Sequence, residues 1–297
     1  MPEDVLEDEK AAALQSLTVP LALERVRAVC AGPLLVLKGA ELGARYPAPS
    51  LRPATDVDLL VPDPDDVQRR LLEGGFAAIG EDDAYYRPTH HLRPLVEPNL
   101  GVKLEVHRRP EWVKWTSPPP PEDLFRVAVP SAVDVDGVSS LPPAYHALVV
   151  AAHSWCNLPF RRLLDLVDLE VLLTDADREE VVFLAERWDL AGVMGTMISA
   201  ADSIFFGAPP SWPLRTWASD MAAAREPTVF RTHVHRLLGP FWALPPHRAA
   251  VVAGRVLARE LLPAPGESWG RKLTRSRLAL RNAFRRRSEH ESRLPHR

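Results

Sequence analysis

Apolar residues recur along this chain at two spacings, one typical of helices and one typical of strands. Between Leu6 and Cys30 they recur at the helical spacing, with an interruption expected near Pro20. The runs "PLLVLKG" and "TDVDLLV" that follow are short and apolar, which is typical of buried strands. The segment "AELGARY" between them suits a short helix. A helix followed by strands therefore opens the chain.

Two further patterns extend this first part. "DPDDVQRRLLEGGF" begins with aspartates that can cap a helix and ends at Gly74-Gly75, so it predicts a helix with both ends marked. "AYYRPTHHLRPLV" and "GVKLEVHRR" predict a pair of strands. In the second of these, apolar residues alternate with Lys103, Glu105 and His107, which therefore share one face.

Prolines separate this part from a second one. "WTSPPPPEDLF" holds four consecutive prolines, which favour an extended linker, and "FRVAVP" with "AVDVDGVSSLP" can form a small hairpin. From Pro142 onward the spacing is almost wholly helical. The sequence thus predicts an α+β protein, with a mixed β-sheet flanked by helices and then a mainly helical C-terminal domain. The expected divisions are 1–110 with a helical flank at 1–32, a linker and hairpin at 111–141, a helical domain at 142–270 and a basic tail at 271–297.

The composition is that of an ordinary globular protein, with 46% hydrophobic and 25% charged residues. No window approaches the ~20 apolar residues that cross a membrane, and the first residues are acidic where a secretory signal is basic. We therefore expect a cytoplasmic protein without membrane association. Cys30 and Cys156 lie in apolar segments without metal-like spacing, which indicates buried thiols.

The net charge of −3 conceals an uneven distribution. Residues 271–297 hold ten Arg or Lys against two Glu, a balance of +8, which leaves −11 for the rest of the chain. Such a tail can bind RNA or another anionic surface, and RNA binding would weaken steeply with salt. A solvated terminal helix explains it equally simply, and we favour this interpretation.

Asp56 and Asp58 are the first candidates for chemistry. On a strand they point to the same face, about 6.5 Å apart at ~3.3 Å rise per residue, while Val57 and Leu59 face the core. We expect both carboxylates at an exposed face, where each raises the pKa of the other unless a cation is shared. Asp58→Asn should then stabilise the metal-free protein, because it removes this repulsion.

Glu105 strengthens the interpretation as a metal site. If its strand lies beside that of the aspartates, three carboxylates meet, and Mg²⁺ (or Mn²⁺) is the ion that prefers such oxygens together with substrate phosphates. Two ions ~3.5 to 4 Å apart would suit phosphoryl transfer from an NTP. The spacing alone favours a metal site over a chance surface pair.

The motifs together resemble the DNA polymerase β-like nucleotidyltransferase superfamily, and more closely a poorly characterised bacterial branch of it. The matching residues are Lys38-Gly39-Ala40, Arg52, Asp56-Val57-Asp58-Leu59-Leu60-Val61 and Glu105-Val106-His107. The likeness continues through "LVVAAHSW" and "RRLLDLVDLEVLL" and spans roughly Leu34 to Pro210. It implies a nucleotidyltransferase-like catalytic domain over residues 1–110.

The resemblance also implies roles for single residues. Its catalytic and metal-binding residues would be Asp56, Asp58 and Glu105; its nucleotide-binding residues Lys38, Gly39, Ala40 and Arg52; its accessory residues His107, His91 and Arg162. Most of the superfamily has a serine or glycine where this chain has Ala40. Backbone N–H groups at a helix N-terminus, or the side chain of Lys38, would then hold the triphosphate.

Several of these residues also have purely structural interpretations. Lys38 can be a lysine that extends to solvent, and Arg52 can pair with Asp56. His90 and His91 should point to opposite faces of a strand, which argues against a zinc site. His153 is interpreted as a buried core histidine. An ion pair within one helix explains Arg161, Arg162 and Asp165, whereas a grip on substrate is the alternative.

The sequence therefore predicts transfer of a nucleoside monophosphate from NTP·Mg²⁺ to an acceptor. RNA ends, small molecules and protein side chains are acceptors among relatives, and nothing in the sequence selects one. A regulatory module that keeps the fold without turnover is one alternative. An RNA-binding protein that uses the basic tail is another.

Overall fold

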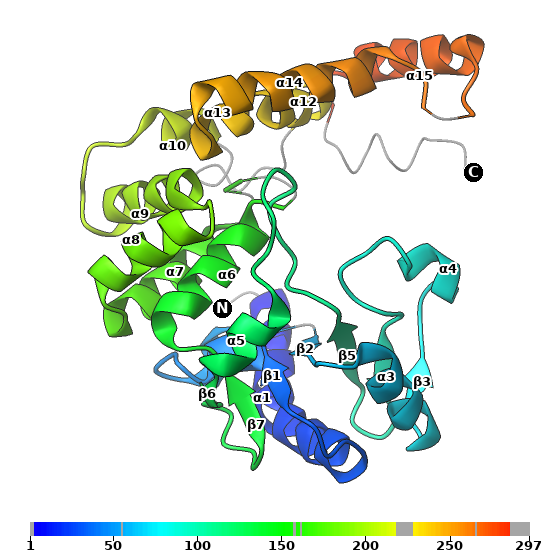
Figure 1. Ribbon diagram of the computed structural model, residues 1–297, viewed down its shortest axis with the longest axis vertical. Helices are drawn as coiled ribbons and strands as arrows, with labels where there is room; N and C mark the ends of the chain where they lie inside the picture. Colours follow the sequence, from blue (N-terminus) through cyan, green and yellow to red (C-terminus); the bar gives the residue numbers. More distant parts are fainter. Residues whose placement is uncertain are drawn as a thin grey trace. The chain divides into compact units, whose positions relative to one another are not determined.

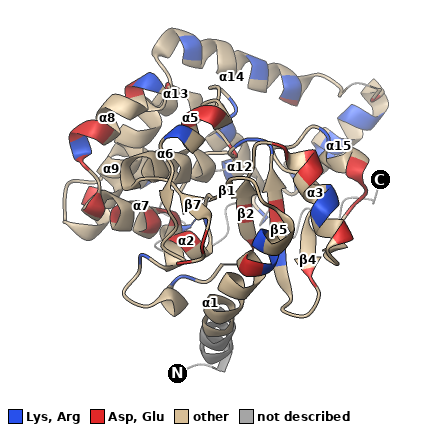
Figure 2. Cartoon of the chain, turned by 60° about the horizontal axis from the view of Figure 1, so that its bottom comes forward, with Lys and Arg blue, Asp and Glu red and all other residues tan. Residues whose placement is uncertain are grey.

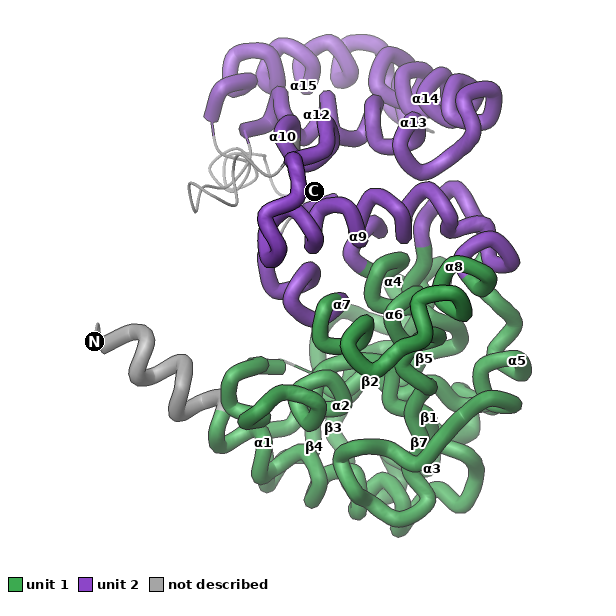
Figure 3. Tube along the Cα trace, turned by 90° about the vertical axis from the view of Figure 1, so that its left-hand side faces the viewer, with its two compact units in different colours: residues 1–112, 117–153, 170–184 green, residues 113–116, 154–169, 185–297 purple. Residues whose placement is uncertain are grey.

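The computed structural model describes residues 3–54, 56–156, 159–160, 162–217, 228–264 and 266–285 (Figure 1). The chain forms two compact units (Figure 3). The first unit comprises Met1–Trp112, Ser117–His153 and Glu170–Leu184, and the second comprises Val113–Thr116, Ser154–Leu169 and Ala185–Arg297. All the strands lie in the first unit. The division of the chain into independently folding domains stays a prediction.

A seven-stranded mixed sheet forms the centre of the first unit, in the order β3-β4-β5-β2-β1-β7-β6. Neighbouring strands are antiparallel except for the pairs β2–β5 and β1–β7, which are parallel. The hairpin β6–β7 thus extends the sheet beside β1. The strands are β1 (Leu34–Val36), β2 (Val57–Leu60), β3 (Ala77–Ala78), β4 (Leu95–Glu97), β5 (Val102–His107), β6 (Val129–Pro130) and β7 (Val138–Ser140).

The register between β2 and β5 confirms the expected adjacency of the two acidic strands. Asp58 lies opposite Glu105, and Leu60 lies opposite His107. Because side chains alternate along a strand, these four side chains lie on one face of the sheet. The acidic and imidazole groups of the predicted site therefore meet at the centre of the sheet.

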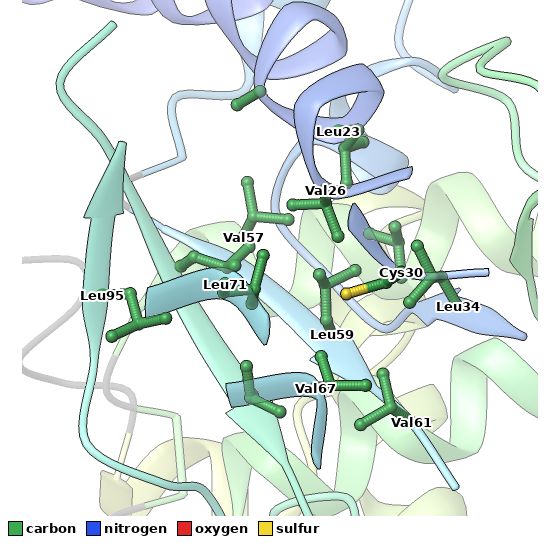
Figure 4. Close-up of a cluster of buried hydrophobic side chains, with 14 of the residues drawn as sticks. Leu23, Val26, Cys30, Leu34, Val57, Leu59, Val61, Val67, Leu71 and Leu95 are labelled. Carbon is green, nitrogen blue, oxygen red and sulfur yellow. The ribbon is translucent and has the colours of Figure 1, made fainter. Parts of the chain in front are cut away.

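The opposite face carries a hydrophobic core. Helices α1 (Glu3–Val29) and α3 (Pro64–Glu73) pack their apolar side chains onto Val57 and Leu59 of β2 (Figure 4). Fully burying one such side chain stabilises the fold by about 1.5–3 kcal/mol. This burial fixes the inward face of β2, so Asp56 and Asp58 project from the other face.

Local signals account for α3. Asp63 caps the helix by accepting a hydrogen bond from the N–H of Asp66, Pro64 occupies the first turn, and Gly74 follows the last residue. Both helix ends predicted from the sequence are confirmed.

The segment "AYYRPTHHLRPLV" differs from the predicted strand. Its end pairs with β5 as β4, whereas Asp83–Tyr86 forms the short helix α4. Asp82 caps this turn by accepting a hydrogen bond from the N–H of Tyr85, which stabilises a helix start where the sequence pattern predicts a strand. Thr89 and His90 then form irregular backbone, and His91 forms an isolated antiparallel bridge with His107.

The remaining elements are helices. In the first unit these are α2 (Ala40–Gly43), η1 (Pro49–Leu51) and α5 (Pro121–Arg126). Then follow α6 (Pro143–Ser154), α7 (Leu163–Asp175), α8 (Arg178–Arg187), α9 (Ala191–Phe205), α10 (Trp212–Trp217), α12 (Val229–Leu238), α13 (Pro240–Ala243), α14 (Pro246–Leu261) and α15 (Trp269–Arg281). The α+β class and the mainly helical C-terminal region are confirmed.

Two sequence-based expectations concern buried thiols and the basic tail. Cys30 and Cys156 are buried, as expected, and neither forms a disulfide bond within the described residues. The start of the tail forms α15, and residues 286–297 lie outside the described residues. Across the described chain, no helix combines the length and apolar character that a membrane crossing requires.

Candidate active site

Three potential ligand groups converge where β2 and β5 run side by side. An oxygen of Asp58, an oxygen of Glu105 and a ring nitrogen of His107 all lie within 4.8 Å of one another. Asp58 is only 2% exposed and His107 is fully buried, so Asp58 does not occupy the exposed face expected from the sequence.

Cations neutralise Asp58 in this position. The ammonium of Lys38 lies 3.3 Å from its Oδ2, and Nε2 of His107 donates a hydrogen bond of 2.8 Å to its Oδ1. Burial, the largest single influence, raises the pKa of Asp58, but the charge of Lys38 and the hydrogen bond from His107 outweigh it. The pKa is therefore held well below its ordinary value, and Asp58 is ionised.

Asp56 is placed differently from Asp58. It is 28% exposed, and its carboxylate lies 3.5 Å from the ammonium of Lys103. Lys103 also donates a hydrogen bond of 2.5 Å to Glu105. The two aspartates therefore do not share one cation: Lys38 lies beside Asp58, and Lys103 lies beside Asp56. Burial lowers the pKa of Lys103, but its hydrogen bond to Glu105 and the nearby carboxylates outweigh this and raise it.

Gly39 fixes the turn between β1 and α2. Its φ of +64° favours glycine, and a Cβ at this position would lie 2.6 Å from the backbone oxygen of Asp56. The turn therefore approaches the acidic strand at backbone contact. Ala40 begins α2, and buried Glu41 holds this helix by accepting hydrogen bonds from Ser131 and from the N–H of Ala132.

A second polar group adjoins Lys38. Nδ1 of His153 lies 3.2 Å from the Lys38 ammonium and 2.6 Å from Oε2 of Glu111, and Nε2 of His90 lies 3.9 Å from the same oxygen. Burial raises the pKa of Glu111, but the hydrogen bond and charge of His153 outweigh it and lower the pKa to about 2. Burial lowers the pKa of His90 to about 3.

Sequence reasoning missed part of this group. His153 is hydrogen-bonded, as a core histidine would be, but it is not buried in the core: its side chain is 25% exposed and contacts Lys38 and Glu111. Lys103 lies on the same strand face as Glu105, so the alternating pattern of this strand could have predicted that Lys103 lies near the carboxylates. Glu111 lies in irregular backbone after β5, where no periodic pattern marks it.

Histidines cluster above β5. The ring centroids of His90 and His91 are 4.7 Å apart, and each lies within 5.6 Å of the ring of His107. Nε2 of His91 lies 3.8 Å from Glu105. The expectation that His90 and His91 point to opposite faces is therefore wrong, because the backbone before β4 is not a regular strand. His91 and His107 thus both border the carboxylate cluster.

Two of the predicted nucleotide-binding residues, Ala40 and Arg52, line the same cavity, which has a volume of about 150 Å³. Residues of α1 and small residues of α2 also line it. The guanidinium of Arg52 donates to the backbone oxygen of Pro53. Arg162 lies in the second unit and forms an ion pair of 2.6 Å with Asp165, as its structural interpretation predicts. Arg161 lies outside the described residues.

A family model described as an uncharacterised nucleotidyltransferase matches residues 2–206. The chain belongs to this family. The matched residues include every strand of the sheet, the turn at Gly39 and the carboxylate cluster, and they end after α9. No curated protein and no solved structure matches the chain. Membership in this nucleotidyltransferase family indicates a transferase.

Divalent metal ions are typical of nucleotidyltransferases, and the donor set fits one. Asp58 and Glu105 offer the oxygens that Mg²⁺ and Mn²⁺ prefer, whereas the nitrogen of His107 suits transition ions. Nδ1 of His107 is buried and has no hydrogen-bond partner among the described residues, so Nδ1 could carry the ring proton and leave Nε2 as a ligand without breaking a hydrogen bond at Nδ1. A divalent ion that accepts both oxygen and nitrogen ligands, such as Mn²⁺, is compatible with this set.

Proposed function

We propose that this nucleotidyltransferase transfers a nucleoside monophosphate from an NTP to an acceptor at the β2–β5 cluster. Asp58, Glu105 and His107 would hold a divalent ion, with Asp56 at its rim. The observation that supports this most is the register, which sets Asp58 directly opposite Glu105 on parallel strands. When bound, the ion would neutralise triphosphate charge and activate the acceptor oxygen.

Lys38 has two roles in this proposal. Its ammonium keeps Asp58 ionised in the metal-free protein, at 3.3 Å. Its long flexible side chain also carries a positive charge beside the Gly39 turn, where we place the triphosphate. The carboxylate of Glu111, which accepts a hydrogen bond from His153 and interacts with the charge of Lys38, would hold Lys38 close to that turn.

The nucleotide-binding set is proposed as Lys38, Gly39, Ala40 and Arg52. Gly39 allows the backbone to come close to the acidic strand, and Ala40 starts a short helix at the turn. Arg52 would contact phosphate through its planar guanidinium. RNA ends, small molecules and protein side chains are all chemically suitable acceptors, because each offers a nucleophilic oxygen.

A regulatory module without turnover is the second candidate. Two observations favour it: Ala40 lacks a hydroxyl, and Lys38 already neutralises Asp58. Such a module would bind NTP and transfer nothing. The comparison of binding with transfer separates the two candidates.

A transfer assay tests the proposal. The protein would be incubated with each α-labelled NTP in turn, with Mn²⁺ or Mg²⁺, and with a fractionated cell extract that supplies acceptors. We expect label in one acceptor fraction, loss of transfer in Glu105→Gln, and normal transfer in the control Glu73→Gln, an exposed residue of α3. Nucleotide binding without any labelled product would favour the regulatory module, and equal transfer by Glu105→Gln would refute the site.

A further inference from the structure

A groove in the second unit lies outside the proposed active site. Helices α12, α14 and α15 enclose a cavity of about 600 Å³, lined mostly by apolar side chains. This volume lies within the roughly 300–1,000 Å³ of sites that hold small molecules. The three helices follow the residues matched by the nucleotidyltransferase family.

One end of the groove is apolar. The N-terminus of α12 meets the chain just after α15, through hydrogen bonds from the N–H of Phe230 to the carbonyl of Ala283 and from Val229 to Arg285. Phe230 and Leu280 line this end and are 52% and 76% exposed. It is therefore an open apolar surface.

The other end is polar and cationic. Glu260 near the end of α14 pairs with His233 of α12 at 3.4 Å, and its backbone carbonyl accepts a hydrogen bond from the ammonium of Lys272 of α15. Arg236 and Arg275 line the same groove, and Arg275 also pairs with Glu267 at 3.0 Å. Charged groups thus gather at one end and apolar groups at the other.

Lys272 points most directly to a ligand. It is 5% exposed, although it carries a charge. Burying an ammonium is costly unless it meets an anion or several acceptors. Within the described chain its hydrogen bond goes to one carbonyl, and the carboxylate of Glu267 interacts with its charge without a hydrogen bond, so two of its three N–H donors remain for a bound group. An anion at this end of the groove would supply those acceptors.

The residues around Lys272 are also predominantly basic. Residues 228–285 hold eleven Arg or Lys against two Glu, and Figure 2 shows basic residues along α14 and α15. This excess attracts anions to the whole three-helix region. Because like charges repel, this excess also argues against the basic residues after Arg285 as the group that binds at the cationic end.

We propose that this groove binds a single-chain anionic amphiphile, with its carboxylate at Lys272 and its apolar chain along Phe230 and Leu280. A carboxylate accepts the free donors of Lys272, and the apolar chain covers the exposed side chains at the other end. An acidic amphipathic helix or an anionic bilayer fits less well, because the cation is buried between helices rather than presented on a surface.

Fluorescence titration of the full chain with parinaric acid, a fluorescent polyene fatty acid, tests this site below the micellar concentration. Its methyl ester is the matched ligand without the anionic group. Lys272→Met keeps the apolar stem and removes the charge; Arg259→Met, on an exposed face of α14, is the control. Melting curves of both variants would verify that each is folded.

We expect the acid to bind at least roughly tenfold more tightly than the ester, because a hydrogen bond to a charged group is lost with the ester. Lys272→Met should remove this preference, and Arg259→Met should keep it. The proposal is overturned if acid and ester bind the wild-type protein equally, or if Lys272→Met binds both as the wild type does. Binding of anionic vesicles or of an acidic helical peptide, with no binding of the free acid, would also overturn it.

If Lys272→Met does not fold, Ala279→Glu places a negative charge in the groove, and unchanged acid binding would then refute the proposal.

Discussion

Replacing Asp58 with asparagine removes one negative charge from a buried cluster and leaves its shape almost unchanged. Lys38 then loses the carboxylate that lies 3.3 Å from its ammonium. The amide of the new side chain still offers an oxygen to His107, so the hydrogen bond of 2.8 Å can remain. The variant therefore isolates the charge interaction between Lys38 and the side chain at position 58.

The structure gives the magnitude of the change. At 3.3 Å and an effective dielectric constant of about 20, the attraction between Lys38 and Asp58 is about 5 kcal/mol. Lys38 is 15% exposed and stays close to His153, so part of this loss is recovered by water and by neighbouring groups. We expect the free energy of unfolding to fall by about 2–4 kcal/mol. The sequence alone predicted the opposite sign, because it did not reveal Lys38 beside Asp58.

Asp56→Asn is the matched control, since it removes the same charge two residues earlier. Asp56 and Lys103 are 28% and 35% exposed and 3.5 Å apart, so we expect a loss below about 1 kcal/mol. Urea unfolding of the metal-free proteins would measure both variants. Equal losses, or a stabilised Asp58→Asn, would refute the assignment of Lys38 as the cation that balances Asp58.

The same pair of variants has a defined pH dependence. The folded-state pKa of Asp58 lies below its ordinary value of 3.8, so its contribution to stability is complete above about pH 4. It is lost as the pH falls below that value, because the unfolded state binds the proton first. The difference between the wild type and Asp58→Asn should therefore shrink below about pH 4 and stay constant above it.

Two further predictions concern stability. Gly39→Ala should lower the free energy of unfolding by about 2–4 kcal/mol, because its Cβ would lie 2.6 Å from the Asp56 oxygen at a φ of +64°. Gly32→Ala, whose Cβ would have nothing within 4 Å, should change the free energy of unfolding little, and equal effects of the two variants would contradict this prediction. Burial, with a smaller effect of Arg231, lowers the pKa of His235 to about 4, so this side chain should account for a loss of roughly 3 kcal/mol as the pH falls from about 6.5 to 4. In pH-dependent unfolding, His235→Gln should therefore lose less than the wild type over that window.

Strand periodicity was sufficient to predict the acidic part of the site. The alternation in "VKLEVHR" placed Glu105 and His107 on one face, and the apolar neighbours of Asp58 placed it on the same side of the sheet. Both inferences use only neighbours along the chain. The α+β class followed from the change between strand and helix spacing.

The contacts around Lys38 could not be predicted in the same way. Lys38 and His153 are 115 residues apart in sequence, and their contact arises because α6 packs near the end of β1. Nothing local to His153 distinguishes a partly exposed histidine from a buried one on an apolar helix. Glu111 lies in irregular backbone after the end of β5, where no periodic pattern predicts the direction of a side chain.

Divalent ion binding by the β2–β5 cluster is tested most directly with Mn²⁺. Electron paramagnetic resonance follows the signal of free aqueous Mn²⁺, which decreases as the ion binds protein. We expect the wild-type nucleotidyltransferase to bind Mn²⁺ more tightly with NTP present, Asp58→Asn and Glu105→Gln to lose most of this binding, and Glu73→Gln to retain it. Mn²⁺ binding by Asp58→Asn and Glu105→Gln at the wild-type level would contradict the proposed active site.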